Sequence, residues 1–146
     1  MSDDLALVDT NVLVYSVFPE SDHYEASRTL LDGAQAGQTL LCLAPQVLIE
    51  FYAVVTNPNR VAQPRRPEEA IEVIEKFLSM RGATLLPVPP DVVSRWLALA
   101  RKYPVAGSAT FDVQLVATML GNGVRKIFTF DRDHFDRFDE VEAIIP

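Results

Sequence analysis

Short apolar runs alternate along the chain with longer segments of helical periodicity. Residues 5–8 are continuously apolar, which indicates a strand buried on both faces. Similar runs predict further strands at 39–43, 83–88, 126–130 and 142–145. Because helices are predicted between most of these strands, the order indicates an α/β fold: a parallel sheet with right-handed crossovers and helices on both faces.

Capping residues, prolines and glycines set the ends of the predicted helices. Asp22 followed by Glu25 resembles a capping box and opens a helix that extends to about Ala36. Pro45 suits the first turn of a helix, and Pro67 begins another with acids in its first turn. The predicted helices are 22–36, closed by Gly37; 45–56, closed by residues 57–59; 67–81, closed by Gly82; 91–103; and 109–120.

The length of 146 residues is typical of one domain, and no repeat or low-complexity linker divides it. We therefore expect a single domain over residues 1–146. No apolar stretch approaches the length of a membrane span, and residues 1–4 are acidic, unlike the start of a signal peptide. Cys42 is the only cysteine, which excludes an intramolecular disulfide and a cysteine zinc cluster. These features predict a cytoplasmic protein that does not contact a membrane.

Three aspartates follow predicted strands. In parallel sheets, ligands bind beyond the carboxyl ends of the strands, where the strand order reverses. Asp9 directly follows the first strand, and Asp131 and Asp133 follow the fourth. Taken singly, each could equally be a turn-forming residue, since aspartate favours turns.

Two further carboxylates lie on the apolar faces of predicted helices. Glu50 is one turn from both Val47 and Val54, and Asp112 precedes apolar residues at helical spacing. A buried charge must be paired, protonated or bound to a metal. No Lys or Arg stands at helical spacing to pair with Glu50 or Asp112. A salt bridge would therefore need a partner from elsewhere in the fold.

If four carboxylates converge, about four negative charges lie in one site: those of Asp9, Glu50, Asp112 and Asp131. Like charges at such short distances oppose full ionisation of the carboxylates. A divalent cation removes the conflict, and oxygen ligands without His or Cys favour Mg²⁺ or Mn²⁺. This composition fits metal-assisted phosphodiester hydrolysis. The net charge of −7, from 13 basic and 20 acidic residues, argues against broad nucleic-acid binding but not against such a site.

Four short motifs stand in order along nearly the whole chain. Residues 7–15 read LVDTNVLVY, 47–51 read VLIEF, 111–117 read FDVQLVA and 129–135 read TFDRDHF. Together they resemble the PIN-domain ribonucleases, and among them the VapC-type toxins of bacterial and archaeal toxin–antitoxin pairs. One departure is Val113, where the family more often has alanine.

The resemblance implies a three-layer α/β/α PIN domain with a parallel, roughly five-stranded sheet. It also implies a Mg²⁺- or Mn²⁺-dependent endoribonuclease that hydrolyses RNA and forms a homodimer. A cognate antitoxin would keep it inactive by laying its C-terminal segment across the active-site groove.

The resemblance further assigns roles to the acidic residues and their neighbours. Asp9 and Asp112 would be direct metal ligands, whereas Glu50 and Asp131 would hold the metal through water or bind a second ion. The secondary positions, which would orient carboxylates, contact phosphate or add a fifth acid, are Thr10, Asn11, Thr129 and Asp133.

Other functions fit the sequence less well. A phosphatase of the haloacid dehalogenase class needs an aspartate where Asn11 stands, and a receiver domain needs one after the third strand, where residues 89–90 are prolines. A non-catalytic binding module would have no use for four retained acids. The closest rival is a housekeeping PIN-domain nuclease without an antitoxin, and the short single-domain chain favours the toxin.

Basic and imidazole side chains offer further candidates. Arg60, Arg65 and Arg66 form the densest basic patch, which we interpret as a solvated loop, with a contact to the RNA backbone as the alternative. His23 and His134 could act as general acids, but neither has a partner at a suitable spacing. We therefore expect surface or helix-end roles for both.

Overall fold

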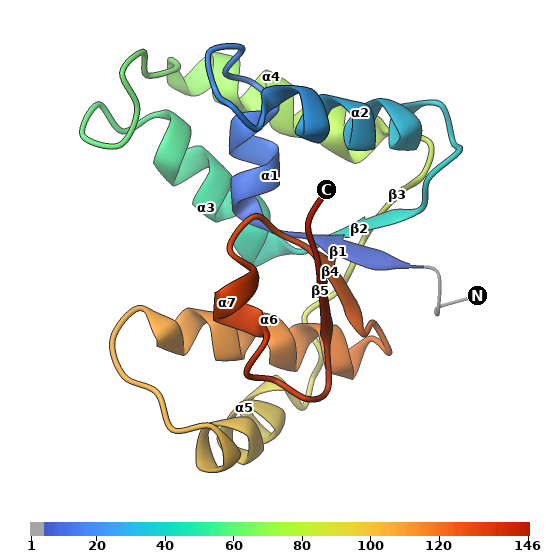
Figure 1. Cartoon of the computed structure of the whole chain (residues 1–146), viewed down its shortest axis with the longest axis vertical. Helices are drawn as coiled ribbons and strands as arrows, with labels where there is room; N and C mark the ends of the chain where they lie inside the picture. The colour runs from blue at the N-terminus through green and yellow to red at the C-terminus, as the bar shows by residue number, and fades with distance from the viewer. Residues whose placement is uncertain (1–4) are drawn as a thin grey trace.

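The protein has a five-stranded parallel sheet with helices on both faces (Figure 1). The structure is a computed structural model and describes residues 5–146. The strands lie in the order β3-β2-β1-β4-β5, and each neighbouring pair is parallel. The predicted α/β fold class is thereby confirmed. The acidic start at 1–4 lies outside the described residues. The strands are β1 (Ala6–Val8), β2 (Leu41–Leu43), β3 (Ala83–Leu85), β4 (Lys126–Phe128) and β5 (Glu142–Ile144).

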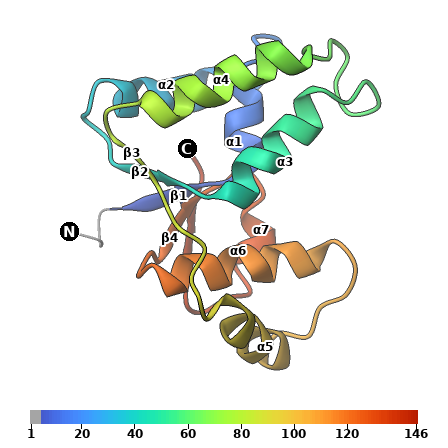
Figure 2. The same cartoon turned by 180° about the vertical axis from the view of Figure 1, so that it is seen from behind.

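The helices divide between the two faces of the sheet, as Figures 1 and 2 show from opposite sides. Right-handed crossovers that step in opposite directions along a sheet place their helices on opposite faces. One face carries α1 (Thr10–Tyr15), α2 (Tyr24–Gln35), α3 (Pro45–Val55) and α4 (Pro67–Ser79). The other carries α5 (Val92–Lys102), α6 (Ala109–Gly121) and α7 (Arg132–Phe135). None of these helices is long and apolar enough to cross a membrane.

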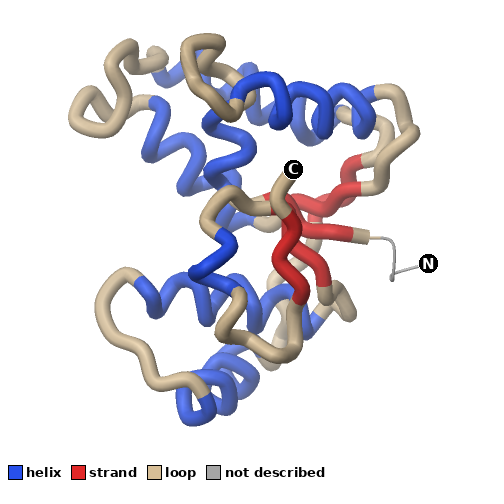
Figure 3. Tube along the Cα trace, in the orientation of Figure 1, coloured by secondary structure: helices blue, strands red, loops and turns tan. Residues whose placement is uncertain are grey.

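Five of the helices were predicted, and two were not. The helix α1 has six residues and α7 has four. Each comes shortly after a strand, as the tube in Figure 3 shows. Such short segments contain too few turns for an apolar period to emerge. The strands were predicted in the right places but too long, since each has three residues.

Two predicted helix boundaries were wrong. The capping box at Asp22 does not form: α2 begins at Tyr24, its N-cap is His23, and no side chain caps it. Gly82 does not close α4, which ends at Ser79. Instead a Cβ at Gly82 would lie 2.0 Å from the carbonyl oxygen of Thr39. Glycine is required there because the chains that enter β2 and β3 approach each other closely.

The core occupies both sides of the central strand. All three residues of β1 are buried, and α3 and α6 pack apolar faces toward the sheet. On one side, Phe51 of α3 contacts Phe77 of α4 edge to face, with ring centroids 5.1 Å apart. Since β1 is buried between two layers, the residue that follows it emerges at the carboxyl edge of a rigid sheet.

Candidate active site

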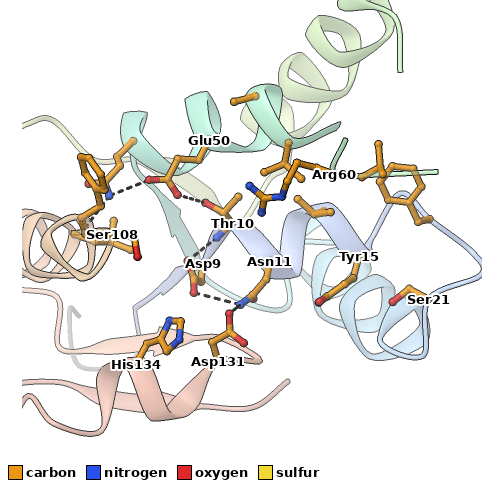
Figure 4. Close-up of a pocket in the computed structure, with 18 of the residues that line it drawn as sticks. Asp9, Thr10, Asn11, Tyr15, Ser21, Glu50, Arg60, Ser108, Asp131 and His134 are labelled. Carbon is orange, nitrogen blue, oxygen red and sulfur yellow. Dashed lines mark hydrogen bonds between the residues drawn. The ribbon is translucent and has the colours of Figure 1, made fainter. Parts of the chain in front are cut away.

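The strand order reverses between β1 and β4, and aspartates follow both strands at this point (Figure 4). Asp9 is the N-cap of α1, and its Oδ1 accepts a hydrogen bond of 2.8 Å from the backbone N–H of Thr10. Asp131 is the N-cap of α7. Both carboxylates therefore lie where ligands bind in open parallel sheets.

Polar side chains connect the two aspartates. The Thr129 hydroxyl donates to Asp9 Oδ2 at 2.8 Å and accepts from the backbone N–H of Asp131 at 3.0 Å. The Asn11 amide donates to Asp131 Oδ2 at 3.1 Å and approaches Asp9 Oδ2 at 3.4 Å. Thr129 is fully buried. These contacts hold the loops after β1 and β4 in one arrangement.

Glu50 reaches the same region from α3. Its Oε2 lies 3.2 Å from the hydroxyl of Thr10, and its Oε1 accepts from the Gln46 amide at 3.2 Å. The same Gln46 amide donates to the backbone oxygen of Phe111 at 2.9 Å. The start of α6 is thus tied to the first turn of α3, which places Asp112 near Glu50.

Asp112 lies beside an arginine and a histidine that the sequence did not reveal as its partners. Its side chain is 24% exposed, and its Oδ2 lies 3.3 Å from Arg137 Nη2 and 3.8 Å from His134 Nδ1. Both partners come from α7 and the residues after it. His134 is exposed in the last turn of α7, which agrees with the expected surface or helix-end role, and it also lines the cavity. The one signal in the sequence that could have linked His134 to the site is its position within the closing motif, residues 129–135.

One cavity of about 700 Å³ contains the predicted catalytic carboxylates. Its lining includes the four acids Asp9, Glu50, Asp112 and Asp131, and also Thr10 and Asn11. Two other predicted positions are not among the described residues that line the cavity. Thr129 is hydrogen-bonded to Asp9, and Asp133 is exposed on α7.

The electrostatics of the cavity oppose full ionisation of its acids. Burial raises the pKa of Asp9 to about 6, and the charges of Asp112 and Asp131 add to the rise, while hydrogen bonds from Thr129 and Thr10 lower it. Burial also raises the pKa of Asp112, against the opposing effect of His134 and Arg137. A cation in the cavity would favour the ionised form of both carboxylates.

The donor set fits a hydrated magnesium or manganese ion. In the part of the chain that the structure describes, no three His, Cys, Asp or Glu side chains are arranged to hold an ion directly. Mg²⁺ is commonly bound by one or two carboxylates and keeps several waters. Four hard carboxylates around one cavity fit that mode, whereas a cage of direct protein ligands does not form in this conformation.

Comparison with known proteins adds independent information. The family model described as "PIN domain" matches residues 6–141. Ribonuclease VapC48 of Mycobacterium tuberculosis is 29% identical over 138 residues, which cover 94% of each chain. Ribonuclease VapC24 of the same organism is 30% identical over 131 residues, which cover 90% of this chain and 89% of the relative.

Solved structures share the fold at low sequence identity. Mycobacterium tuberculosis VapC20, described as a toxin that cleaves the sarcin–ricin loop, superposes with a TM-score of 0.69 at 15% identity. That match covers 97% of this chain and 99% of the other. VapBC2 of Rickettsia felis, solved with a DNA fragment from its promoter, gives a TM-score of 0.65 at 16% identity, with 97% and 98% coverage.

Proposed function

Because the chain belongs to the PIN-domain family, we propose that it is an endoribonuclease that depends on Mg²⁺ or Mn²⁺. The observation that carries the proposal is one cavity at the switch point of the sheet, lined by four carboxylates from four separate segments. The curated relatives named ribonucleases support RNA as the substrate. We propose further that residues 1–146 act as a single domain.

We propose that the four acidic residues hold the metal ion in two different ways. Asp9 and Asp112 would bind the ion directly, and Glu50 and Asp131 would hold it through water. The chemistry that such an ion would supply is activation of a water for attack on phosphorus and neutralisation of charge on the phosphate oxygens. The carboxylates of the cavity would therefore hold the positive charge that phosphodiester hydrolysis requires.

The surrounding side chains position these carboxylates. Thr129 orients Asp9 through its hydroxyl, and Asn11 couples the aspartate after β1 to the aspartate after β4. Arg137 keeps a positive charge beside Asp112, which favours the ionised carboxylate. Gln46 holds Glu50 from the preceding turn of α3.

We propose that this enzyme is the toxin of a type II toxin–antitoxin pair. The matched relatives are VapC ribonucleases, and their alignments cover 94% and 89% of their own length, so this chain and the relatives are alike in extent. The Rickettsia felis VapBC2 structure supports an antitoxin partner. Large exposed apolar side chains, such as Ile49 on α3 and Phe111 in the cavity wall, support a homodimer. A housekeeping nuclease would lack the antitoxin.

The test is cleavage of total cellular RNA by the purified protein, freed of any partner. We expect discrete cuts with Mg²⁺ or Mn²⁺ that disappear with EDTA. Asp9→Asn should abolish them without unfolding the protein, because it removes one negative ligand and little volume. Asp139→Asn makes the same substitution at an exposed residue outside the cavity, and should cleave normally.

Two results would contradict the proposal: cleavage that persists in EDTA, or full activity of Asp9→Asn. The toxin assignment has its own test. Induced expression should arrest growth, and co-expression of a small DNA-binding protein encoded next to the gene should relieve the arrest. Cleavage without growth arrest would favour the housekeeping nuclease.

A further inference from the structure

The three arginines between α3 and α4 have different surroundings in the structure. The Arg65 guanidinium donates to the carbonyl of Val17 and lies over the Phe18 ring, 5.1 Å from its centroid. Arg66 pairs with Glu68 and Glu69, each at 3.3 Å. Two of the three are therefore engaged in holding the protein itself together.

Arg60 is the exception. It makes no ion pair and no side-chain hydrogen bond with any residue from 5 to 146, and it is exposed. It lines the cavity that contains the four carboxylates, and Figure 4 shows it entering from the side of α1 and α3. Among the described residues of the cavity wall, it is the one Lys or Arg.

The backbone around Arg60 is held in place by Asn57. The carbonyl oxygen of Asn57 accepts from the N–H of Arg60 at 3.0 Å and from that of Val61 at 3.2 Å. Its side-chain oxygen accepts from the N–H of Asn59 at 2.9 Å. A guanidinium on such a segment loses less entropy on binding than one on a free loop.

An unpaired guanidinium beside an acidic cavity suits a polyanionic strand. The chain carries a net charge of −7, so its overall field repels nucleic acid. Guanidinium binds phosphate through two parallel hydrogen bonds, and contacts of this kind position a strand without reading its sequence. Arg60 supplies that contact within the cavity where the field is otherwise negative.

We propose that Arg60 binds a backbone phosphate of the RNA strand next to the one that is cleaved. This inference rests on the proposed ribonuclease function. Arg60 forms no ion pair within 4.0 Å with any of the four carboxylates, so its guanidinium is not committed to the proposed metal ligands. A contact to a neighbouring phosphate is made equally before and during the reaction. It therefore lowers KM and leaves kcat unchanged.

The experiment compares Arg60→Gln with Arg125→Gln in steady-state cleavage of one RNA. Arg125 is exposed, has no ion pair among the described residues, and precedes β4, at the end of the sheet away from the cavity. We expect Arg60→Gln to raise KM roughly tenfold with kcat unchanged, and Arg125→Gln to change neither. Arg60→Lys keeps the charge but loses the paired geometry, so it should fall between wild type and Arg60→Gln.

A binding measurement separates this proposal from the enzymatic one. In an Asp9→Asn background, adding Arg60→Gln should weaken binding of single-stranded RNA and reduce the slope of log affinity against log salt by about 0.7, the value for one phosphate contact. If wild type cleaves no RNA, the proposed function fails, and the slope still tests Arg60.

Several outcomes would overturn the role of Arg60. One is that Arg60→Gln leaves both KM and the salt dependence of RNA binding unchanged. Others are that it lowers kcat alone, or that Arg125→Gln raises KM by the same factor. Loss of antitoxin binding with unchanged RNA binding would assign Arg60 to the protein partner instead. Because Arg60 is exposed and unpaired, its variants should unfold at the wild-type temperature, which checks the fold.

Discussion

Asp9 illustrates how one residue can be unfavourable for folding and useful for chemistry. It follows Leu7 and Val8, both fully buried, and so its carboxylate leaves water when the sheet forms. Hydrogen bonds from Thr129 and Thr10 offset only part of that cost, and its pKa stays raised at about 6. Strongly perturbed groups in a cavity are typical of functional sites.

The raised pKa predicts a pH-dependent stability difference between wild type and Asp9→Asn without metal. The folded pKa of about 6 exceeds the reference value of 3.8, so the native state binds the proton more tightly between these values. Ionised Asp9 therefore destabilises the fold, fully above pH 6 and progressively less as the pH falls toward 4.

We expect Asp9→Asn to be more stable than wild type near pH 7, by up to about 3 kcal/mol for a shift of two pKa units. The advantage should vanish near pH 4. Denaturant unfolding in EDTA from pH 4 to 7.5 measures it. A stability difference that is constant with pH would show that Asp9 is not desolvated in the folded protein.

At the scale of elements, the site depends on how α1 meets α3. The buried Thr10 of α1 has its hydroxyl 3.2 Å from Glu50 and 3.4 Å from the backbone oxygen of Val47, both on α3. This hydroxyl is the polar link between the segment that carries Asp9 and the helix that carries Glu50. The orientation of Glu50 is therefore a property of two helices together.

Thr10→Val tests this link, because it exchanges the hydroxyl for a methyl group of similar size. Glu50 would lose a partner, and we expect roughly a tenfold loss of activity, as is usual for groups that orient ligands. The free energy of unfolding should change by only about 1 kcal/mol. Thr10→Ser keeps the hydroxyl and should retain most activity; equal losses in both variants would contradict the role of the hydrogen bond.

For the whole molecule, two exposed apolar side chains allow the proposed homodimer to be tested. Ile49 is 69% exposed on α3, and Phe111 is 56% exposed at the start of α6. The Gln46–Phe111 contact brings these two segments together. Because extended apolar patches are typical of interfaces, the proposed homodimer predicts that these two side chains contribute to one.

Ile49→Asp should convert the proposed homodimer into a monomer, because it places a charge in an apolar contact. The fold should survive, since the side chain is largely exposed in the single chain. Mass measured by light scattering after size-exclusion chromatography gives the result. Leu40→Asp, which precedes β2 at the opposite end of the sheet, is the matched control. A dimer that persists in Ile49→Asp would exclude this surface as the interface.

Local patterns in the sequence determined much of this protein. The apolar run that ends at Val8, the proline that begins α3 and the glycine at residue 37, with a φ of +77°, each predict structure within a few residues. Such features depend on neighbours along the chain, so the parallel fold and the carboxylates after its strands could be predicted.

The tertiary structure alone decided which of these groups meet. Arg137 pairs with Asp112 across 25 positions of sequence, and glycine is required at position 82 by the close approach of Thr39, in the segment that leads into β2. Of the three arginines between α3 and α4, only the packing distinguished Arg60 in the cavity from Arg65 and Arg66. The physical reason is that such contacts depend on distances between remote segments, which exist only once the sheet and its helices have packed.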